Sequence, residues 1–196
     1  MLSDIKKGEA FITRDGRTVA LRPFKKSDAD EMLRFANSIV REKRKNRDLG
    51  IAAFDKRLTR AFERKFLDTT IKGMRDRQVV SVAAFSGGNL VGECMMRRRE
   101  PRDLSHTALL GIVIQDSYRG VGLGEELMRR ALLGARKIGV WLVELEVISI
   151  NHHAIRLYEK MGFHRVGVIP NKVQRDGRLI DIVVMYADIR QTINPP

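Results

Sequence analysis

The stretch Gln115-Asp-Ser-Tyr-Arg-Gly-Val-Gly-Leu-Gly-Glu-Glu-Leu127 decides how this chain folds around a ligand. An apolar run typical of a strand precedes it over residues 109–114, and an amphipathic helix follows without a break. Gly120, Gly122 and Gly124 lie between the two at alternate positions. Backbone N–H groups at a helix N-terminus favour an anion, and glycines let a phosphate approach the main chain. The stretch therefore predicts a strand–turn–helix cradle for a phosphorylated ligand.

The length and composition are typical of one globular domain. The chain has 196 residues, of which 43% are hydrophobic and 31% charged. We therefore expect residues 1–196 to form a single domain with a core at about 18–188. No apolar run approaches the ~20 residues that span a bilayer, and residues 1–7 lack the apolar centre of a secretory signal. The expected location is the cytoplasm, without membrane binding.

The single cysteine, Cys94, limits the chemistry further. One cysteine forms no internal disulfide and makes no cysteine-cluster metal site. Cys94 lies in an apolar run, 90–96, where a buried inert thiol is expected rather than a nucleophile. The sequence thus predicts neither a metal site nor a catalytic cysteine.

The chain is strongly basic. It has 37 Lys and Arg against 24 Asp and Glu, a formal net charge of +13 at pH 7. This charge favours anionic ligands and keeps nucleic acid among the partners to be considered. The basic residues form short clusters over 41–47, 97–99 and 172–178, and a solvated face explains each cluster taken alone. Eight Phe, three Tyr and one Trp are few for a surface that stacks bases.

Hydrophobic periodicity predicts an α+β (mixed α/β) fold. Apolar residues keep helical spacing over 32–40, 54–66, 123–138 and 154–161. Strands are predicted over 18–24, 79–85, 90–96, 107–114, 141–148, 163–169 and 179–186. The last two strands enclose a loop that contains Asp176 and Gly177. Adjacent strand pairs indicate a mixed, mostly antiparallel sheet with helices packed on it.

Two common nucleotide sites do not fit the glycine run. A P-loop requires Gly-Lys-Ser/Thr after its glycines, whereas this chain has Gly124-Glu125-Glu126. A Rossmann dinucleotide site requires G-x-G-x-x-G directly after the first strand of a βαβ repeat. Here the spacing is G-x-G-x-G, four polar residues follow the strand, and a hairpin precedes it. The remaining interpretation is a pyrophosphate site made by one strand–turn–helix unit inside a mixed sheet.

Two stretches in a defined order resemble the motifs of a known family. Arg119-Gly-Val-Gly-Leu-Gly124 matches the pattern Q/R-x-x-G-x-G/A, and Asn151-His-His-Ala-Ile-Arg-Leu-Tyr-Glu-Lys-Met-Gly-Phe163 ends in Y-x-K/R-x-G-F. These patterns are the two half-sites of the GCN5-related N-acetyltransferases (GNAT), which bind acetyl-coenzyme A (acetyl-CoA). The predicted element order is similar to that of the family from about residue 19 to 186. The resemblance implies an acyl-CoA N-acyltransferase fold with about six to seven strands and about four helices.

The resemblance also implies direct transfer of an acetyl group from acetyl-CoA to a primary amine, without an acyl-enzyme. The pantetheine arm would run beside Ile112, Val113 and Ile114, and a main-chain N–H near Val113 would polarise the thioester carbonyl. The following strand, 141–148, would diverge and leave a slot for the thioester. Asn151 would cap its helix and touch the coenzyme. The pyrophosphate would lie against the backbone of Arg119, Gly120, Val121, Gly122, Leu123 and Gly124.

Tyr158 is the expected general acid. An unperturbed tyrosine has a pKa of about 10, so its hydroxyl is protonated at neutral pH and can protonate the departing thiolate. A tyrosine that merely packs on an amphipathic helix is the alternative. The resemblance, rather than the helix pattern, favours the acid.

Glu146 is the expected general base, acting directly or through water. Glu144 and Glu146 alternate on one face of a largely apolar strand, which is costly unless they are paired or functional. Glu146 also stands twelve positions before Tyr158, as does the proposed base of ribosomal-protein alanine acetyltransferases. An ion pair of Glu146 with Arg129 or Arg156 is the alternative. Glu93 is a reserve base.

The resemblance assigns the acceptor to the connection between the first two helices and to the loop before the last strand. These stretches hold the basic clusters 41–47 and 172–178, which would repel a polyamine and attract an acidic peptide or an anionic small amine. We expect a protein N-terminus or another protein amine as acceptor. A small or antibiotic-like amine is one alternative, and a basic nucleic-acid- or ribosome-binding module is another. A homodimer is compatible with the sequence.

Overall fold

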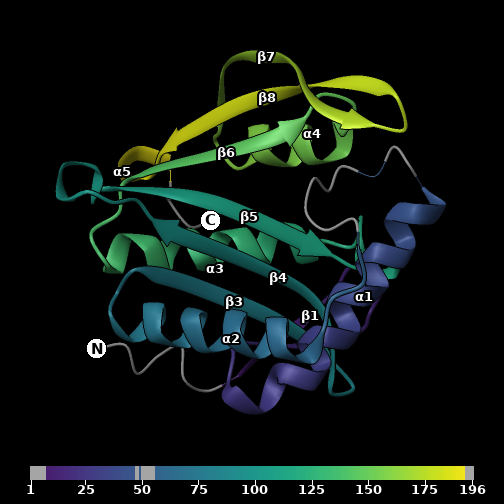
Figure 1. Ribbon diagram of the computed structural model, residues 1–196. Helices are drawn as coiled ribbons and strands as arrows, with labels where there is room; N and C mark the ends of the chain where they lie inside the picture. Colours follow the sequence, from purple (N-terminus) through teal and green to yellow (C-terminus); the bar gives the residue numbers. More distant parts are fainter. Residues whose placement is uncertain (1–7, 47–48, 50–55, 193–196) are drawn as a thin grey trace.

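One mixed sheet organises the part of the chain that the computed structural model describes, residues 8–46, 49 and 56–192 (Figure 1). Its eight strands lie in the order β1-β2-β3-β4-β5-β6-β8-β7. Neighbouring strands are antiparallel except β5 and β6, which are parallel. The strands are β1 (Glu9–Ile12), β2 (Thr18–Arg22), β3 (Val79–Ser86), β4 (Asn89–Arg98), β5 (Thr107–Ile114), β6 (Leu142–Ile148), β7 (His164–Arg175) and β8 (Arg178–Asp188).

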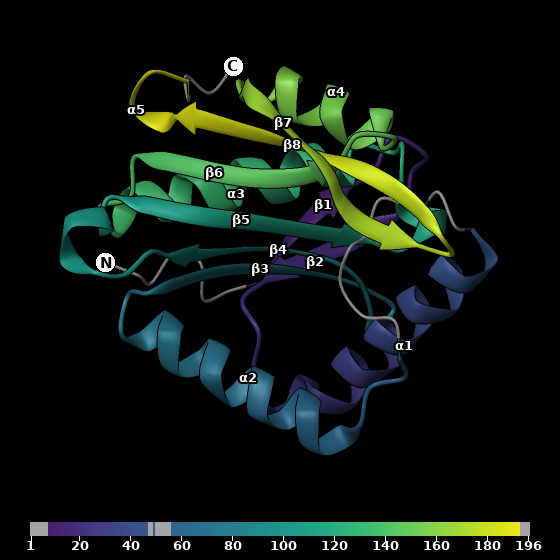
Figure 2. The same ribbon diagram turned by 45° about the horizontal axis from the view of Figure 1, so that its top comes forward.

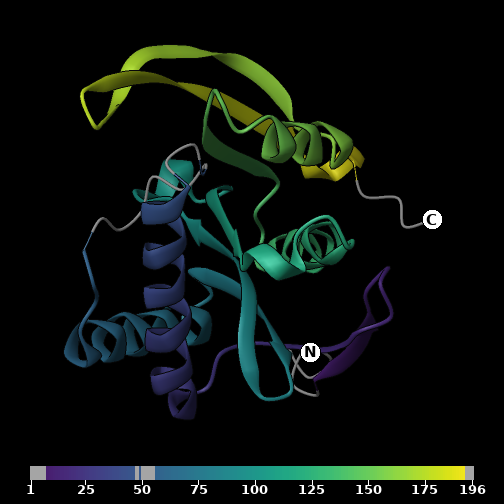
Figure 3. The same ribbon diagram turned by 90° about the vertical axis from the view of Figure 1, so that its right-hand side faces the viewer.

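Helices cover both faces of the sheet (Figure 3). α1 and α2 lie on one face around an apolar cluster that includes Phe35, Leu67 and Phe85. α3 and α4 lie on the other face, where Leu127 and Ile155 are buried in the larger core. The amphipathic pattern of each helix thus buries one side against the sheet. The helices are α1 (Ala29–Lys45), α2 (Arg60–Arg75), α3 (Leu123–Lys137), α4 (His152–Lys160) and the one-turn α5 (Ile189–Thr192).

The pairing between β5 and β6 is short. It joins Thr107, Ala108 and Leu109 to residues 142–144, and the two strands then diverge (Figure 1). Beyond that point β5 stays paired with β4 as far as Ile114, and β6 stays paired with β8 as far as Ile148. A gap therefore opens in the middle of the sheet, beside the C-terminal halves of β5 and β6.

The predicted α+β fold is confirmed: the seven predicted strands and four predicted helices are present in the described part of the chain, which also contains β1 and the one-turn α5. β1 was not predicted, because it has only four residues and its Ile12 is exposed, so its sequence shows no alternation of apolar and polar residues. α2 begins at Arg60, where the Thr59 hydroxyl accepts a hydrogen bond from the Phe62 N–H. Residue 54, the predicted start, lies outside the described residues. Pairing of β1 and full burial of Ile189 extend the folded region beyond 18–188 on both sides.

The predicted loop before the last strand is largely a strand in the structure. β7 continues to Arg175, and a two-residue turn of Asp176 and Gly177, both with positive φ, leads into β8. The pairing register shifts between Ile169 and Val173, so a bulge accommodates the proline at position 170. Arg175 Nη1 donates to the carbonyl oxygen of Leu49 at 2.9 Å. The hairpin therefore contacts Leu49, which follows α1 in the chain, and Figure 2 shows its tip on the same side of the molecule as the C-terminal end of α1.

Gly134 of α3 tests how closely this helix packs on the sheet. A Cβ atom at this position would lie 2.7 Å from Cγ1 of Val80, and a β-branched valine has little freedom to move away. We expect Gly134→Ala to lower the free energy of unfolding by about 1–3 kcal/mol, although the same change in an exposed helix raises it by up to about 1 kcal/mol. Urea denaturation measures the difference.

Val80→Ala provides the matched background for that substitution. Removing the valine methyl groups makes room for the alanine, so Gly134→Ala should cost much less in this background than in the wild type. A stabilising effect of Gly134→Ala in the wild-type protein would contradict the close contact.

Candidate active site

The glycine run forms the predicted turn between β5 and α3. Gly120 and Gly122 have φ angles of 74° and 87°, a conformation that L side chains rarely adopt. Gly122 is the N-cap of α3, so the first N–H groups of the helix are directed out of the turn. A Cβ at Gly120 would meet no atom of the described residues within 4 Å, so this side of the turn is open with respect to them. These features fit a pyrophosphate group.

Gly124 has no positive φ, and its missing side chain instead allows close packing. A Cβ there would lie 3.0 Å from Cδ2 of Leu157 in α4 and 3.2 Å from Cδ1 of Ile114 in β5. The start of α3 can therefore approach both α4 and β5, the strand on one side of the gap. The second half-site of the sequence motif thus meets the first in space.

The Arg119 side chain turns away from the open side of the turn. Its Nε donates to the carbonyl oxygen of Ile114 at 2.9 Å, and its Nη1 pairs with Glu42 of α1 at 2.5 Å. A weaker contact joins Nη1 to Asp116 at 3.2 Å. The guanidinium therefore ties α1 to the end of β5, and the predicted coenzyme contact of Arg119 falls to its backbone.

The register of β4 and β5 determines which backbone groups face the gap. The Gln115 N–H donates to the carbonyl oxygen of Val91 at 2.9 Å. Because bonding direction alternates along an antiparallel strand, odd-numbered residues of β5 bond toward β4 and even-numbered ones point toward β6. The N–H groups of Ile112 and Ile114 therefore point into the gap, whereas that of Val113 points toward β4. The gap-facing N–H groups near Val113 are therefore those of its two neighbours.

Tyr158 is buried beside the same gap. It projects from α4 into the core and has 7% of its surface exposed. Burial, with a smaller contribution from the nearby Cys94, raises the pKa of its hydroxyl well above the ordinary value. Tyr158 and Cys94 belong to one buried cluster, and Ile112 and Ile114 of the diverging part of β5 pack against that cluster. The hydroxyl stays protonated throughout the neutral range, as a general acid requires.

Two further predictions for this region are confirmed. Asn151 caps α4, since its Oδ1 accepts a hydrogen bond from the Ala154 N–H at 3.1 Å. Cys94 is fully buried, and burial followed by the charge of Glu93 raises the pKa of its thiol far above the ordinary value. A thiol that stays protonated is a poor nucleophile.

Glu144 and Glu146 lie on one face of β6, as their spacing predicts, and both form ion pairs. Glu144 pairs with Arg99 at 2.6 Å, and Glu146 pairs with Lys172 of β7 at 2.6 Å. Lys172, rather than Arg129 or Arg156, is the partner of Glu146. Its carboxylate is 44% exposed. The basic clusters 97–99 and 172–178 thus supply structural partners to the two glutamates.

Glu93 differs from Glu144 and Glu146 in its surroundings. It lies in β4 opposite Val113, on the face covered by α1 and α2, and its Oε2 is buried and has no hydrogen-bond partner among the residues that the structure describes. Burial, followed by the charge of Glu63 in α2, raises the pKa of Glu93 to about 7. Burial also raises the pKa of Glu63. Glu63 could not be found from the sequence, because its proximity to Glu93 depends on how α2 crosses the sheet.

A separate pocket of about 340 Å³ lies between α1 and the β3–β4 hairpin. Arg34, Arg41, Gln115 and Tyr118 contribute to its lining, whereas Tyr158 and the three carboxylates above do not. It is therefore distinct from the gap between β5 and β6. Within the described residues, no three His, Cys, Asp or Glu side chains are grouped to hold a metal ion, and no helix is long and apolar enough to cross a membrane.

A family model described as the acetyltransferase (GNAT) family matches residues 43–163. The chain belongs to the GNAT family. The match covers more than half of the sequence and contains the glycine turn, the gap, Glu93 and Tyr158. A GNAT structure from Salmonella typhimurium, yncA with its cofactor acetyl-CoA, has the same fold, with a TM-score of 0.73 at 19% identity over 91% of this chain and 98% of that one.

Curated GNAT relatives act on different classes of acceptor, as their names state. The N-alpha-acetyltransferase RimI of Mycobacterium tuberculosis is 39% identical over 87 residues, 44% of this chain and 53% of RimI. An L-methionine sulfoximine/L-methionine sulfone acetyltransferase of Pseudomonas aeruginosa is 26% identical over 118 residues, 60% of this chain and 69% of that protein. The chain spans about half the length of several curated relatives that it matches.

Gly120→Ala tests the turn as the coenzyme site. The substitution forces an alanine into a positive φ and adds a methyl group on the open side, so we expect the dissociation constant for coenzyme A to rise at least tenfold. Isothermal titration calorimetry measures it. Gly167→Ala is the matched control, because Gly167 lies in edge strand β7 with no atom within 4 Å of a built Cβ and no positive φ. Equal affinities of the two variants would exclude the turn as the site.

Proposed function

We propose that this protein is an N-acetyltransferase that moves an acetyl group from acetyl-CoA to a primary amine of a protein, either an N-terminus or another amine. The observation that carries the proposal is the glycine turn after the end of β5, next to the gap that opens where β5 and β6 have diverged, together with the buried Tyr158 in the core that Ile112 and Ile114 pack against. A sheet that opens at its centre exposes backbone donors and acceptors to an elongated ligand. Membership in the GNAT family supports the same reaction.

Acetyl-CoA supplies the activated acetyl group as a thioester. The backbone from Arg119 to Gly124 binds its pyrophosphate, and Asn151 contacts the coenzyme beside the α4 cap. The N–H of Ile112 or Ile114 hydrogen-bonds the thioester carbonyl oxygen and stabilises negative charge on it. The Tyr158 hydroxyl donates its proton to the departing sulfur.

Glu93 is our preferred acceptor for the proton of the amine. An amine must be neutral to attack, and a carboxylate with a pKa of about 7 can remove a proton near neutral pH. Glu93 also lies opposite Val113, one residue from each gap-facing N–H. Glu146, the base expected from the sequence, would first have to leave Lys172. It remains the alternative that the variants below distinguish.

The acceptor is proposed from charge. Arg99 and Lys172 are partly exposed beside the glutamates of β6, and the chain carries a net charge of +13. Such a rim favours an amine whose neighbouring groups are anionic. RimI, named as an N-alpha-acetyltransferase, supports a protein N-terminus. The methionine sulfoximine acetyltransferase supports the second candidate, a small amine that carries a carboxylate.

Thiol release from acetyl-CoA across a panel of acceptors tests the function. The panel contains acidic and basic N-terminal peptides, amino acids including methionine sulfoximine, spermidine and an aminoglycoside, and mass spectrometry identifies each product. We expect the highest kcat/KM with acidic N-terminal peptides. A preference for spermidine would contradict the proposed acceptor, and no thiol release with any acceptor would contradict the proposed activity.

Tyr158→Phe tests the general acid. Loss of the proton donor should lower kcat by about 10²–10⁴. Stability should change little, because the ring keeps its contact with Phe163 at a centroid distance of 6.0 Å. Steady-state kinetics and thermal unfolding measure the two effects. Tyr186→Phe, at a partly exposed tyrosine of β8, is the control. A Tyr158→Phe enzyme with wild-type kcat would remove this residue from the mechanism.

Glu93→Gln tests the general base through pH. In the wild type, kcat/KM for the acceptor should rise with a midpoint near pH 7 as Glu93 ionises. Glu93→Gln should abolish this rise and lower the rate at pH 8 by about 10² or more. Glu146→Gln should keep the midpoint. The reverse pattern, with the midpoint lost only in Glu146→Gln, would assign the base to Glu146.

The same pKa has a consequence for stability. A carboxyl group whose folded-state pKa is raised stabilises the fold below its unfolded pKa, near 4.5, and loses that contribution as pH rises through about 7. Glu93→Gln should therefore raise the melting temperature relative to the wild type at pH 8, and the two should converge near pH 4. A constant difference at both pH values would contradict the raised pKa.

A further inference from the structure

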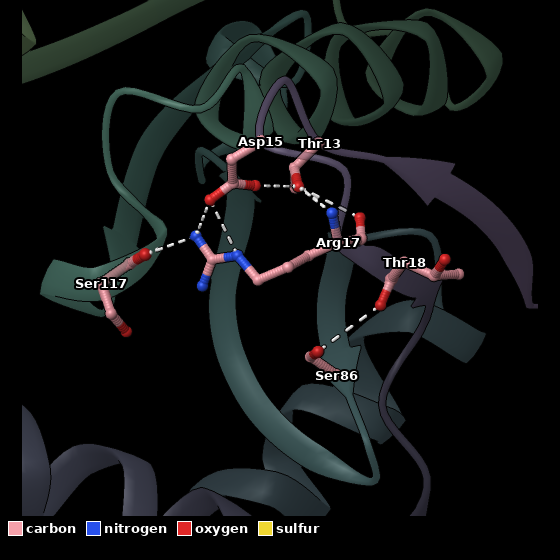
Figure 4. Close-up of polar contacts among 6 residues, drawn as sticks. All are labelled: Thr13, Asp15, Arg17, Thr18, Ser86 and Ser117. Carbon is pink, nitrogen blue, oxygen red and sulfur yellow. Dashed lines mark hydrogen bonds and ion pairs between the residues drawn. The ribbon is translucent and has the colours of Figure 1, made fainter.

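The turn that joins β1 to β2, residues 13–17, lies against the glycine turn although the two are about a hundred residues apart in sequence. The Arg14 N–H donates to the carbonyl oxygen of Val121 at 2.9 Å. Arg17 Nη2 donates to the carbonyl oxygen of Ser117 at 2.6 Å (Figure 4). These two contacts to backbone carbonyl groups, one from a main-chain N–H and one from a guanidinium, hold the connection between β5 and α3 at two places.

The contact to Val121 fixes the orientation of one peptide group in the glycine turn. In a trans peptide the C=O of one residue and the N–H of the next point in opposite directions. The Val121 carbonyl points to the Arg14 N–H, so the Gly122 N–H points away from the β1–β2 turn. Gly122 is part of this peptide and Gly120 precedes Val121, and both glycines have φ angles that other residues rarely adopt. An external hydrogen bond is therefore needed to hold one orientation.

The β1–β2 turn is itself well ordered by its own hydrogen bonds. The Gly16 N–H donates to the Thr13 carbonyl at 2.9 Å, which places Arg14 second in a four-residue turn. The buried Thr13 hydroxyl accepts from the Arg17 N–H at 3.0 Å, and Arg17 pairs with Asp15 at 2.6 Å (Figure 4). The Arg17 guanidinium also covers the ring of Tyr118, 3.8 Å from its centroid. The turn is thus a rigid support.

We propose that residues 13–17 are a positioning element for the coenzyme, in which the Arg14 N–H holds the Val121–Gly122 peptide so that the Gly122 N–H is directed at the pyrophosphate. The inference rests on the proposed acetyl-CoA site. It adds a segment outside both sequence motifs, and it makes a backbone group of Arg14, not its charge, the important part. A pre-oriented donor costs less to order when the anion binds.

Two variants of one residue separate the backbone group from the side chain. Arg14→Ala removes the guanidinium and its contact with Glu125 but keeps the N–H. Arg14→Pro also removes the N–H, and proline is favoured at the second position of such a turn. We expect the dissociation constant for coenzyme A, measured by calorimetry, to be about tenfold higher for Arg14→Pro than for Arg14→Ala. Without the Arg14 N–H the Val121–Gly122 peptide is no longer held, and the charge-assisted hydrogen bond from the Gly122 N–H to the pyrophosphate is lost.

A donor without a pyrophosphate distinguishes positioning from general damage. With acetyl-pantetheine, kcat/KM should be equal for Arg14→Pro and Arg14→Ala, whereas with acetyl-CoA it should differ about tenfold. The kcat at saturating acetyl-CoA and the KM for the acceptor should also be equal. Equal affinity of the two variants for coenzyme A, or equal loss with both donors, would overturn the inference.

The wild-type protein gives a test that needs no variant. With ¹⁵N-glycine labelling, titration with coenzyme A should shift the amide resonance of Gly122 strongly and that of Gly16 little. An unshifted Gly122 amide in a protein that binds coenzyme A would overturn the inference and leave the proposed function intact. Absence of any coenzyme A binding to the wild type would instead overturn the proposed function.

Discussion

The early end of the pairing between β5 and β6 is the constraint on which the rest of the structure depends. Three residue pairs join the strands before they diverge, and a buried backbone group left without a partner costs about 1–3 kcal/mol. The Arg119 side chain satisfies the Ile114 carbonyl. The N–H of Ile112 faces the gap, where the proposed coenzyme would supply a partner. The glycine turn, α3 and Tyr158 all lie around this opening.

Local chemistry explains what the sequence could predict. Gly120 and Gly122 have positive φ angles that few other residues adopt, so these glycines allow a turn before α3 to be predicted from the sequence. Asn151 caps α4 through a contact three residues away. Cys94 is buried as its apolar strand indicates. Each of these features depends on neighbours in sequence, and each is present in the structure.

Contacts between distant segments could not be predicted in the same way. The alternation of Glu144 and Glu146 on one face was visible, but the partner of Glu146 depends on the bulged register of β7, which brings Lys172 to it. Glu93 looked like one residue of a hairpin strand. Its burial arises because α2, with Glu63, covers that face. A pattern of period two gives the face of a strand and not the element that covers it.

The short seam between β5 and β6 also has a mechanical meaning. The sheet consists of two parts, one built from β1 to β5 and the other from β6, β8 and β7, and three residue pairs join their strands directly. The larger core, which contains Leu127 of α3, holds buried residues from both parts. A ligand that binds the folded protein stabilises it by mass action, so a coenzyme bound in the gap would add a further connection between the two parts of the sheet.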